Sequence, residues 1–198
     1  MTRRTSRRRN AGGCLVIAIL LTFGMVLAAV LIRWSTGEIK EYRFSLPYEE
    51  YVTKYCEEYG VDSLFIYAMM KQESSFEPDA VSVDNARGLL QLTEETYDWV
   101  KWRMGESGGS FDDMFDPETN IRYGVWLTAY LFDRFENEKT VLAAYHAGMN
   151  ITAEWLKNPE YSENGKTLTV IPYDDTRYHV KKVMGYYKEY KELYGSEE

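Results

Sequence analysis

The rest of the chain is organised around Lys71-Gln72-Glu73-Ser74-Ser75-Phe76. The first three residues of this stretch are the last three of residues 61–73. That segment is predicted to be a helix because apolar side chains recur in it at three- and four-residue spacing. Gly60 closes the helix before it, and Asp62 is suited to cap the new one. Glu73 shares an apolar face of this helix with three preceding side chains. These are Ile66, Met69 and Met70.

A glutamate on an apolar face is partly desolvated, and in a last helical turn it also meets the negative end of the helix dipole. Both effects favour the neutral, protonated form of the Glu73 carboxyl group. A carboxylic acid that keeps its proton near neutral pH is the proton donor that glycosidic bond cleavage requires. The alternative is an ordinary solvent-facing glutamate, which position alone favours because most glutamates lie at protein surfaces.

The charge composition restricts the partners of this protein. The chain of 198 residues contains 31 acidic and 23 basic residues, a formal net charge of −8 at pH 7. Five of the basic residues are arginines within residues 1–13, so 18 remain in the rest of the chain, with a net charge of about −13. This balance argues against nucleic acid and against a positive surface that binds a long polyanion.

Cysteine and histidine are scarce, with two of each in the chain. Two cysteines cannot form a disulfide framework, and Cys56 on an amphipathic helix is expected to pack as a small apolar residue. No cysteine or histidine cluster has the spacing of metal ligands. We therefore predict no metal and no cofactor.

The N-terminal part has the pattern of a membrane anchor. Residues 14–32 form a run of 19 residues without a charged side chain, preceded by the arginine-rich residues 1–13. The run approaches the length that spans a bilayer, whereas the apolar region of a cleaved signal peptide is usually about 7–15 residues long. We predict a cytoplasmic tail, a transmembrane helix and a stalk at residues 33–46, with the following domain outside the cell membrane.

Helical patterns dominate the remainder, residues 47–194. We expect a helix from residue 47 to 59, the central helix, and a loop over residues 77–92 that turns into a short helix at Gly88. Asp116-Pro117-Glu118 is a strong helix start. Further helices are expected at residues 93–104, 116–136, 140–147, 150–157 and 174–194, with a possible extended piece at residues 167–171. The predicted class is mainly α.

Five short motifs occur in a characteristic order along this part of the chain. They are Glu73-Ser74-Ser75-Phe76, Gly88-Leu89-Leu90-Gln91-Leu92, Asn120-Ile121, Ala143-Ala144-Tyr145-His146-Ala147-Gly148 and Asp175-Thr176. Each is weak alone, but together they resemble the lytic transglycosylases of the soluble-transglycosylase (SLT) type. The resemblance covers residues 47–194 and implies a lysozyme-like helical domain of the goose-type and transglycosylase kind.

The resemblance also implies roles for individual residues. Glu73 matches the catalytic acid of the family, and five further residues match positions that line its sugar groove. These are Ser82, Gln91, Tyr145, His146 and His179. Two of them have a plain structural alternative: Ser82 could cap a turn, and Gln91 could satisfy a buried backbone group.

Four positions depart from the pattern of the family. Leu90 replaces a methionine, which conserves volume. His146 replaces an asparagine, His179 a tyrosine, and Asp175 a glutamate. The departures affect the expected contacts with sugar and leave the proton donor unchanged.

Ordinary glycosidases use two carboxylates, whereas here Glu73 is the one glutamate in the motifs and no second acid occupies a matching motif position near it. Asp79 and Asp84 follow Glu73 but are expected to be solvated in a loop. The resemblance implies that the substrate supplies the missing group and that the chain cleaves the MurNAc–GlcNAc β-1,4 bond of peptidoglycan, leaving 1,6-anhydromuramic ends. The alternatives are a lysozyme-type hydrolase and a glycan-binding module without catalysis, part of a wall or secretion machine.

Overall fold

The computed structural model describes residues 20–28 and 43–195 of the chain. The chain divides into two units, Met1–Ser45 and Leu46–Glu198. In the first unit, residues 20–28 form a helix, which lies within the predicted span at residues 14–32. The other residues of that span, the basic tail and most of the stalk lie outside the described residues. Within the described ranges, no helix combines the length and hydrophobicity that crossing a bilayer requires.

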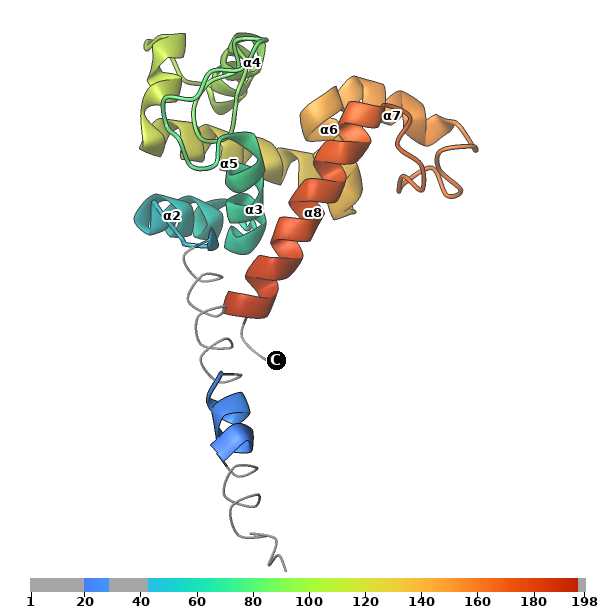
Figure 1. Ribbon diagram of the computed structural model, residues 1–198. Helices are drawn as coiled ribbons and strands as arrows, with labels where there is room; N and C mark the ends of the chain where they lie inside the picture. Colours follow the sequence, from blue (N-terminus) through green and yellow to red (C-terminus); the bar gives the residue numbers. More distant parts are fainter. Residues whose placement is uncertain (1–19, 29–42, 196–198) are drawn as a thin grey trace, which may run out of the picture. The chain divides into compact units, whose positions relative to one another are not determined.

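The second unit is built from helices joined by turns and loops (Figure 1). Its described part has no named strand and contains only two isolated bridges, Val81 with Arg87 and Arg87 with Leu92. The predicted mainly α class is therefore confirmed. The elements in order are α2 (Glu49–Tyr59), α3 (Ser63–Glu73), α4 (Glu94–Met104), η1 (Phe111–Phe115), α5 (Pro117–Arg134), α6 (Glu138–Ala147), α7 (Met149–Lys157) and α8 (Asp174–Tyr194).

Local capping explains most of these boundaries. The Asp62 side chain accepts from the backbone N–H of Leu64 at 2.8 Å, and Thr93 and Asp116 cap α4 and α5 in the same way. Gly60 and Gly105 end α2 and α4 with positive φ angles of 70° and 72°. These starts and stops agree with the sequence prediction.

Other boundaries differ from the prediction. Helix α2 begins at Glu49 instead of residue 47, because Tyr48 has a left-handed backbone and provides no side-chain cap. Helix α6 begins earlier than expected, since Asn137 accepts from two backbone N–H groups. The short helix predicted at Gly88 is wrong, because residues 88–91 form a turn that the Arg87–Leu92 bridge closes. The extended piece predicted at residues 167–171 is not a strand either.

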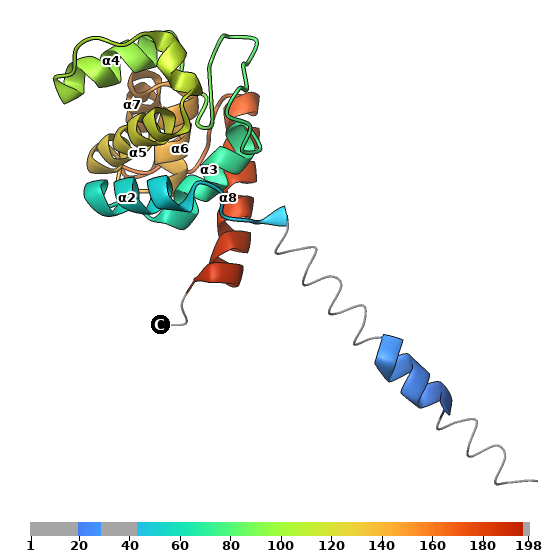
Figure 2. The same ribbon diagram turned by 90° about the vertical axis from the view of Figure 1, so that its left-hand side faces the viewer.

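The core surrounds α3. Six consecutive residues of this helix, residues 65–70, are buried, so the helix lacks the single apolar face that the sequence suggested. Helix α3 packs chiefly against α8, and α2 packs against α5, as the view in Figure 2 also shows. The Phe65 ring meets Phe132 of α5 at 5.3 Å and Tyr187 of α8 at 5.2 Å between ring centroids. This packing holds the C-terminal end of α3, and with it Glu73, in place.

Candidate active site

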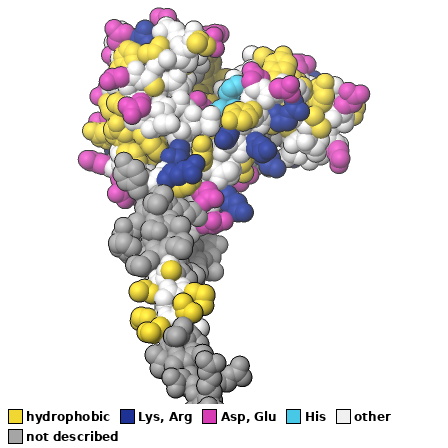
Figure 3. Space-filling model, viewed as in Figure 1, with side chains coloured by type: hydrophobic (Ala, Val, Ile, Leu, Met, Phe, Trp, Pro, Cys, Tyr) yellow, Lys and Arg dark blue, Asp and Glu magenta, His cyan; other side chains and the backbone are white. Residues whose placement is uncertain are grey.

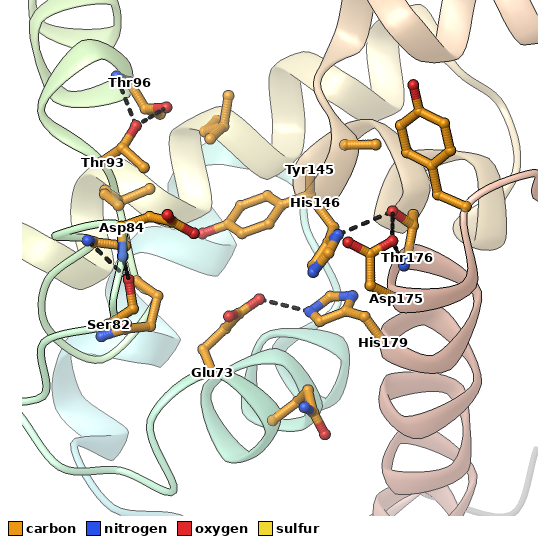
Figure 4. A pocket seen from close by; sticks show the side chains of 17 residues that line it. Glu73, Ser82, Asp84, Thr93, Thr96, Tyr145, His146, Asp175, Thr176 and His179 are labelled. Atoms are coloured by element: carbon orange, nitrogen blue, oxygen red, sulfur yellow. Dashed lines mark hydrogen bonds and ion pairs between the residues drawn. The ribbon is translucent and has the colours of Figure 1, made fainter.

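A pocket of about 590 Å³ opens where the C-terminal end of α3 meets α6 and α8. All six site residues predicted from the sequence line it, although they are distributed over the chain from residue 73 to residue 179. In Figure 4 the Glu73, Tyr145, His146 and His179 side chains point into a common space. The lining residues are Gln72, Glu73, Ser82, Asp84, Ala86, Gln91, Leu92, Thr93, Thr96, Leu127, Tyr145, His146, Ala147, Tyr173, Asp175, Thr176 and His179.

Glu73 is the last residue of α3, and its side chain is 14% exposed. The solvent-facing alternative is therefore wrong for this residue. The backbone turns sharply after it, because Ser75 and Phe76 have φ angles of 52° and 70° in the left-handed region. Such a conformation is strained for residues other than glycine and persists only where the surroundings hold it. The Ser74 hydroxyl helps to hold it by donating to the Leu89 carbonyl oxygen at 2.9 Å.

One side of the pocket is formed by residues 80–93, which we call the loop wall. Asn120 of α5, which is fully buried at 0% exposure, holds the loop wall in place through hydrogen bonds to its backbone. The Asn120 Oδ1 accepts from the Leu90 N–H at 2.8 Å, and its Nδ2 donates to the carbonyl oxygens of Arg87 and Met114. Gly88 approaches Asn120 so closely, at a φ of 73°, that a Cβ there would overlap both Asn120 and the Met114 carbonyl oxygen.

The two predicted groove residues in the loop wall, Ser82 and Gln91, form hydrogen bonds with backbone groups of other loop-wall residues. The Ser82 hydroxyl oxygen accepts from the N–H groups of Asp84 at 3.2 Å and Ala86 at 3.1 Å, which is the turn-capping alternative. The Gln91 Nε2 donates to the carbonyl oxygens of Ala80 and Gly88 at 3.1 and 2.9 Å, which is the alternative of satisfying backbone groups. Both residues also line the pocket, so these bonds fix where their remaining polar atoms lie.

Tyr145 joins the loop wall to α6. Its hydroxyl group donates to the Leu90 carbonyl oxygen at 2.6 Å. Burial, and secondarily the negative charge of Glu73, raises the pKa of Tyr145 well above its usual value. Tyr145 therefore stays a neutral phenol across the physiological range.

The opposite side of the pocket consists of His146, Asp175, Thr176 and His179, which we call the helical wall. The His179 Nε2 lies 2.7 Å from the Glu73 Oε1, and the His179 side chain is only 6% exposed. Its other ring nitrogen, Nδ1, is buried and has no hydrogen-bond partner among the described residues. The tautomer with the hydrogen on Nε2, donating to the Glu73 carboxylate, fits these surroundings.

His146 lies against His179, with ring centroids 4.5 Å apart. Its Nδ1 is 3.1 Å from the Thr176 Oγ1 (Figure 4). Burial, followed by the neighbouring His179 ring, lowers the pKa of His146 below its usual value, while Glu73 and Asp175 act in the opposite direction. The His146 side chain remains exposed on one side. Histidine atoms, coloured cyan, are visible at the surface in Figure 3.

Comparison with known proteins identifies this arrangement. The family model "Transglycosylase SLT domain" matches residues 50–168. The chain belongs to the transglycosylase SLT family. The SLT match includes the loop wall, Glu73 and His146, and it ends before Asp175, Thr176 and His179.

Similar curated proteins support the same assignment. The soluble lytic murein transglycosylase of Escherichia coli K12 is 30% identical over 78% of this chain and 24% of its own length. The membrane-bound lytic murein transglycosylase C of Serratia proteamaculans is 36% identical over 49% of this chain and 30% of its own length. The chain thus spans about a quarter of the length of the soluble relatives that it matches.

Solved structures extend the likeness to the fold. The 70 kDa soluble lytic transglycosylase of Escherichia coli matches with a TM-score of 0.69 and 28% identity, over 79% of this chain and 26% of that one. A complex of the 70 kDa soluble lytic transglycosylase with bulgecin A matches with a TM-score of 0.71 and 28% identity, over 80% of this chain and 26% of that one. The lysozyme-like SLT fold expected from the motifs is therefore confirmed.

The sequence did not predict every functional feature of this SLT domain. Asp84 and Asp175 are exposed carboxylates that line the pocket. The direct bond between His179 and Glu73 was also missed, although a histidine at a groove position was a signal for it. Across residues 20–28 and 43–195, no group of three or more His, Cys, Asp or Glu side chains is arranged to hold a metal ion.

Proposed function

We propose that this SLT domain is a lytic transglycosylase that cleaves the MurNAc–GlcNAc β-1,4 bond of peptidoglycan and leaves 1,6-anhydromuramic ends. The observation that carries the proposal is the nearly buried Glu73 carboxyl group, 14% exposed, in a pocket of about 590 Å³. The names of similar proteins, lytic murein transglycosylases, support the same substrate. A carboxyl group in this setting is suited to general acid–base catalysis.

Glu73 acts twice in the proposed reaction. It first donates its proton to the glycosidic oxygen as the C1–O bond breaks, and the N-acetyl group of muramic acid assists departure of the leaving sugar. The muramic 6-hydroxyl then attacks C1 and returns its proton to Glu73. No water is consumed, and Glu73 ends in the protonated state in which it began.

His179 holds the Glu73 carboxyl group during both steps. With the hydrogen on Nε2, its ring donates to Oε1 whether Glu73 is ionised or carries a proton on Oε2. The bond therefore survives both proton transfers and directs Oε2 toward the reacting oxygen. His179 is a positioning residue in this scheme, and holding a reacting group in one geometry lowers the entropic part of a barrier.

The remaining predicted residues serve substrate binding in this proposal. Ser82, Gln91, Tyr145 and His146 line the pocket with hydroxyl, amide, phenol and imidazole groups. Such groups suit the hydroxyl and acetamido substituents of sugar rings. The loop-wall residues are already bonded to backbone, so little side-chain freedom is lost when sugar binds.

Mass analysis of muropeptides tests the function directly. The full chain is incubated with purified peptidoglycan, and the products are compared with those of Glu73→Gln. Ends in the 1,6-anhydro form that only the wild type produces are the expected result. Reducing ends would instead establish a hydrolase, and unchanged strands would leave a glycan-binding module.

The hydrolase is the second candidate function, because Asp84 and Asp175 line the same pocket as Glu73. A hydrolase uses a second carboxylate as nucleophile or base. Both carboxylates are exposed, which favours ordinary solvated aspartates over that role.

We also infer that the chain is attached to the cell membrane. The proposed organisation is a basic cytoplasmic tail at residues 1–13, a transmembrane anchor at residues 14–32, a stalk at residues 33–46 and an extracytoplasmic catalytic domain at residues 47–194. Support comes from the uncharged run of 19 residues and from similarity to membrane-bound lytic murein transglycosylase C. Protease added outside intact protoplasts should digest the catalytic domain, and its protection would contradict this topology.

A further inference from the structure

A second pocket, of about 710 Å³, continues from the first one. The two pockets have four lining residues in common, Thr96, Leu127, Tyr145 and Ala147. Helices α4 and α5, with the end of α6 and the start of α7, form the second pocket, which we call the aromatic groove. Its other lining residues are Glu95, Trp99, Trp102, Arg103, Tyr130, Leu131, Arg134, Ala144, Gly148, Met149, Asn150 and Ile151.

Packed rings make one wall of the aromatic groove rigid. The Trp99 ring meets Tyr130 at 5.1 Å and Trp126 at 6.0 Å between centroids, and Trp126 stacks on Tyr130 at 5.7 Å. Trp102, one helical turn beyond Trp99, is 70% exposed. A large indole left open beside a packed aromatic cluster is a typical anchor of a binding surface.

Two arginines border these rings. The Arg103 guanidinium lies 5.1 Å from the Tyr130 ring centroid, 5.9 Å from that of Trp99 and 6.0 Å from that of Trp102. Arg134 contacts the Met149 sulfur at 4.0 Å. Neither arginine forms an ion pair with a carboxylate of the described residues, and the one acidic side chain that lines the groove is Glu95.

Unpaired arginines at one groove are unexpected in a chain whose residues after the N-terminal tail carry a net charge of about −13. Elsewhere in the described part, Arg87, Arg122 and Arg177 each contact an acidic side chain. A guanidinium held against rings keeps its planar set of donors oriented, and that set matches a carboxylate. Two such groups suit isolated carboxylates and are too few to bind a long polyanion.

We propose that the aromatic groove binds the carboxylate-bearing peptide stem of the glycan strand whose sugars occupy the first pocket. This inference rests on the proposed function for its substrate, because a stem is attached to the sugar that would lie beside Glu73. Arg103 and Arg134 bind stem carboxylates, and the exposed face of Trp102 covers the apolar part of the stem. The groove thereby selects strands that carry free stem carboxylates.

Binding to three kinds of defined strand tests this inference. The strands carry stems with free carboxylates, the same stems with amidated carboxylates, or no stems. The full chain with Glu73→Gln, which leaves the strands intact, is compared with the same chain carrying Arg103→Gln and Arg134→Gln. We expect the Kd for free-carboxylate stems to rise about tenfold and the other two values to change less than about twofold.

Two control proteins separate charge from fold. Lys139→Gln with Lys181→Gln removes two exposed positive charges that line neither pocket and should leave all three Kd values unchanged. Arg103→Lys with Arg134→Lys should recover part of the affinity and the salt dependence of binding. Equal weakening on all three strands, or none on any, would overturn the inference.

The same experiment distinguishes this inference from the proposed function. Affinity that depends on stem carboxylates and on both arginines, together with wild-type protein that releases no anhydro ends, would refute the catalysis and retain the groove. Anhydro ends released equally from free and amidated stems, with equal affinities, would retain the catalysis and refute the groove.

Discussion

The two walls of the pocket use their polar side chains differently. In the loop wall, Ser82 and Gln91 bond to backbone groups of their own segment, and Asn120 ties that segment to α5. In the helical wall, His179 bonds to the Glu73 side chain, and His146 bonds to Thr176 and lies against His179. One wall is held by hydrogen bonds to backbone groups, and the other consists of side chains in contact with each other and with the Glu73 carboxyl group.

Because of this difference, we expect the two walls to control different properties of the pocket. Changes in the loop wall should alter stability and the form of the pocket, since each bond there satisfies a backbone group of the wall. Changes in the helical wall should alter activity and its pH dependence with little loss of stability. The family match covers the loop wall and ends before α8, so His179, which bonds to Glu73, lies outside the matched residues.

The largest loss of activity is expected for a change at Glu73, which lies between the two walls. Glu73→Gln keeps the size of the side chain but cannot donate and recover a proton, so turnover of peptidoglycan should fall by at least about 100-fold. The unfolding temperature should stay close to that of the wild type. Anhydro-muropeptide release measures the activity, and Glu77→Gln, which replaces an exposed glutamate outside the pocket, is the matched control. Activity of Glu73→Gln within about tenfold of the wild type would refute the assignment.

Gly88→Ala tests the loop wall. Its Cβ would overlap the Asn120 amide and the Met114 carbonyl oxygen at a φ unfavourable for alanine, so the free energy of unfolding should fall by about 2–4 kcal/mol. Gly185→Ala is the control, because its Cβ meets nothing within 4 Å in the interior of α8. That change should stabilise the protein by about 0.5–1 kcal/mol. Equal denaturant midpoints for the two variants would contradict the strained loop.

His179→Phe tests the helical wall. An aromatic ring without a hydrogen-bond donor replaces the imidazole and the bond to Glu73 is lost, so kcat should fall about 10- to 100-fold while KM changes little. His179→Tyr supplies a hydroxyl group and restores the residue that the family resemblance implies, so it should recover most of the activity. A pH–rate curve of His179→Phe that superimposes on that of the wild type, apart from scale, would show that His179 does not affect proton transfer.

A smaller effect is expected for the exposed carboxylates of each wall. Asp84→Asn and Asp175→Asn, alone or combined, should change turnover by less than about threefold, because the proposed reaction uses one carboxyl group. A hydrolase would instead lose at least about 100-fold when its second carboxylate is removed. Turnover and product mass for the three variants decide between the two reactions.

The smallest effect concerns His146, whose pKa is lowered from the usual 6.5. Because the folded chain binds this proton less readily than the unfolded chain, His146 lowers stability as the pH falls below about 6.5. His146→Asn should reduce this loss, so its unfolding temperature should fall less steeply between about pH 7 and pH 5. Equal slopes for the two proteins would show that His146 titrates alike in both states.

Local sequence rules predicted much of the helical framework. Asp62, Thr93 and Asp116 begin helices as expected because a short polar side chain caps the first turn wherever the fold places it. The order of the motifs predicted the SLT family and the six residues that line one pocket. These features depend on residues close together in sequence, or on a pattern that single residues retain.

The contacts within the site depend on residues that are far apart in the sequence. Gly88 begins a turn instead of a helix because Asn120, 32 residues later, binds the backbone on both sides of it. His179 is 106 residues from Glu73, and no local pattern indicates that their side chains meet. Packing of α8 against α3 creates that contact, because it brings an imidazole to a nearly buried carboxyl group. The sequence determined which groups are present, and long-range packing decided which of them form hydrogen bonds with each other.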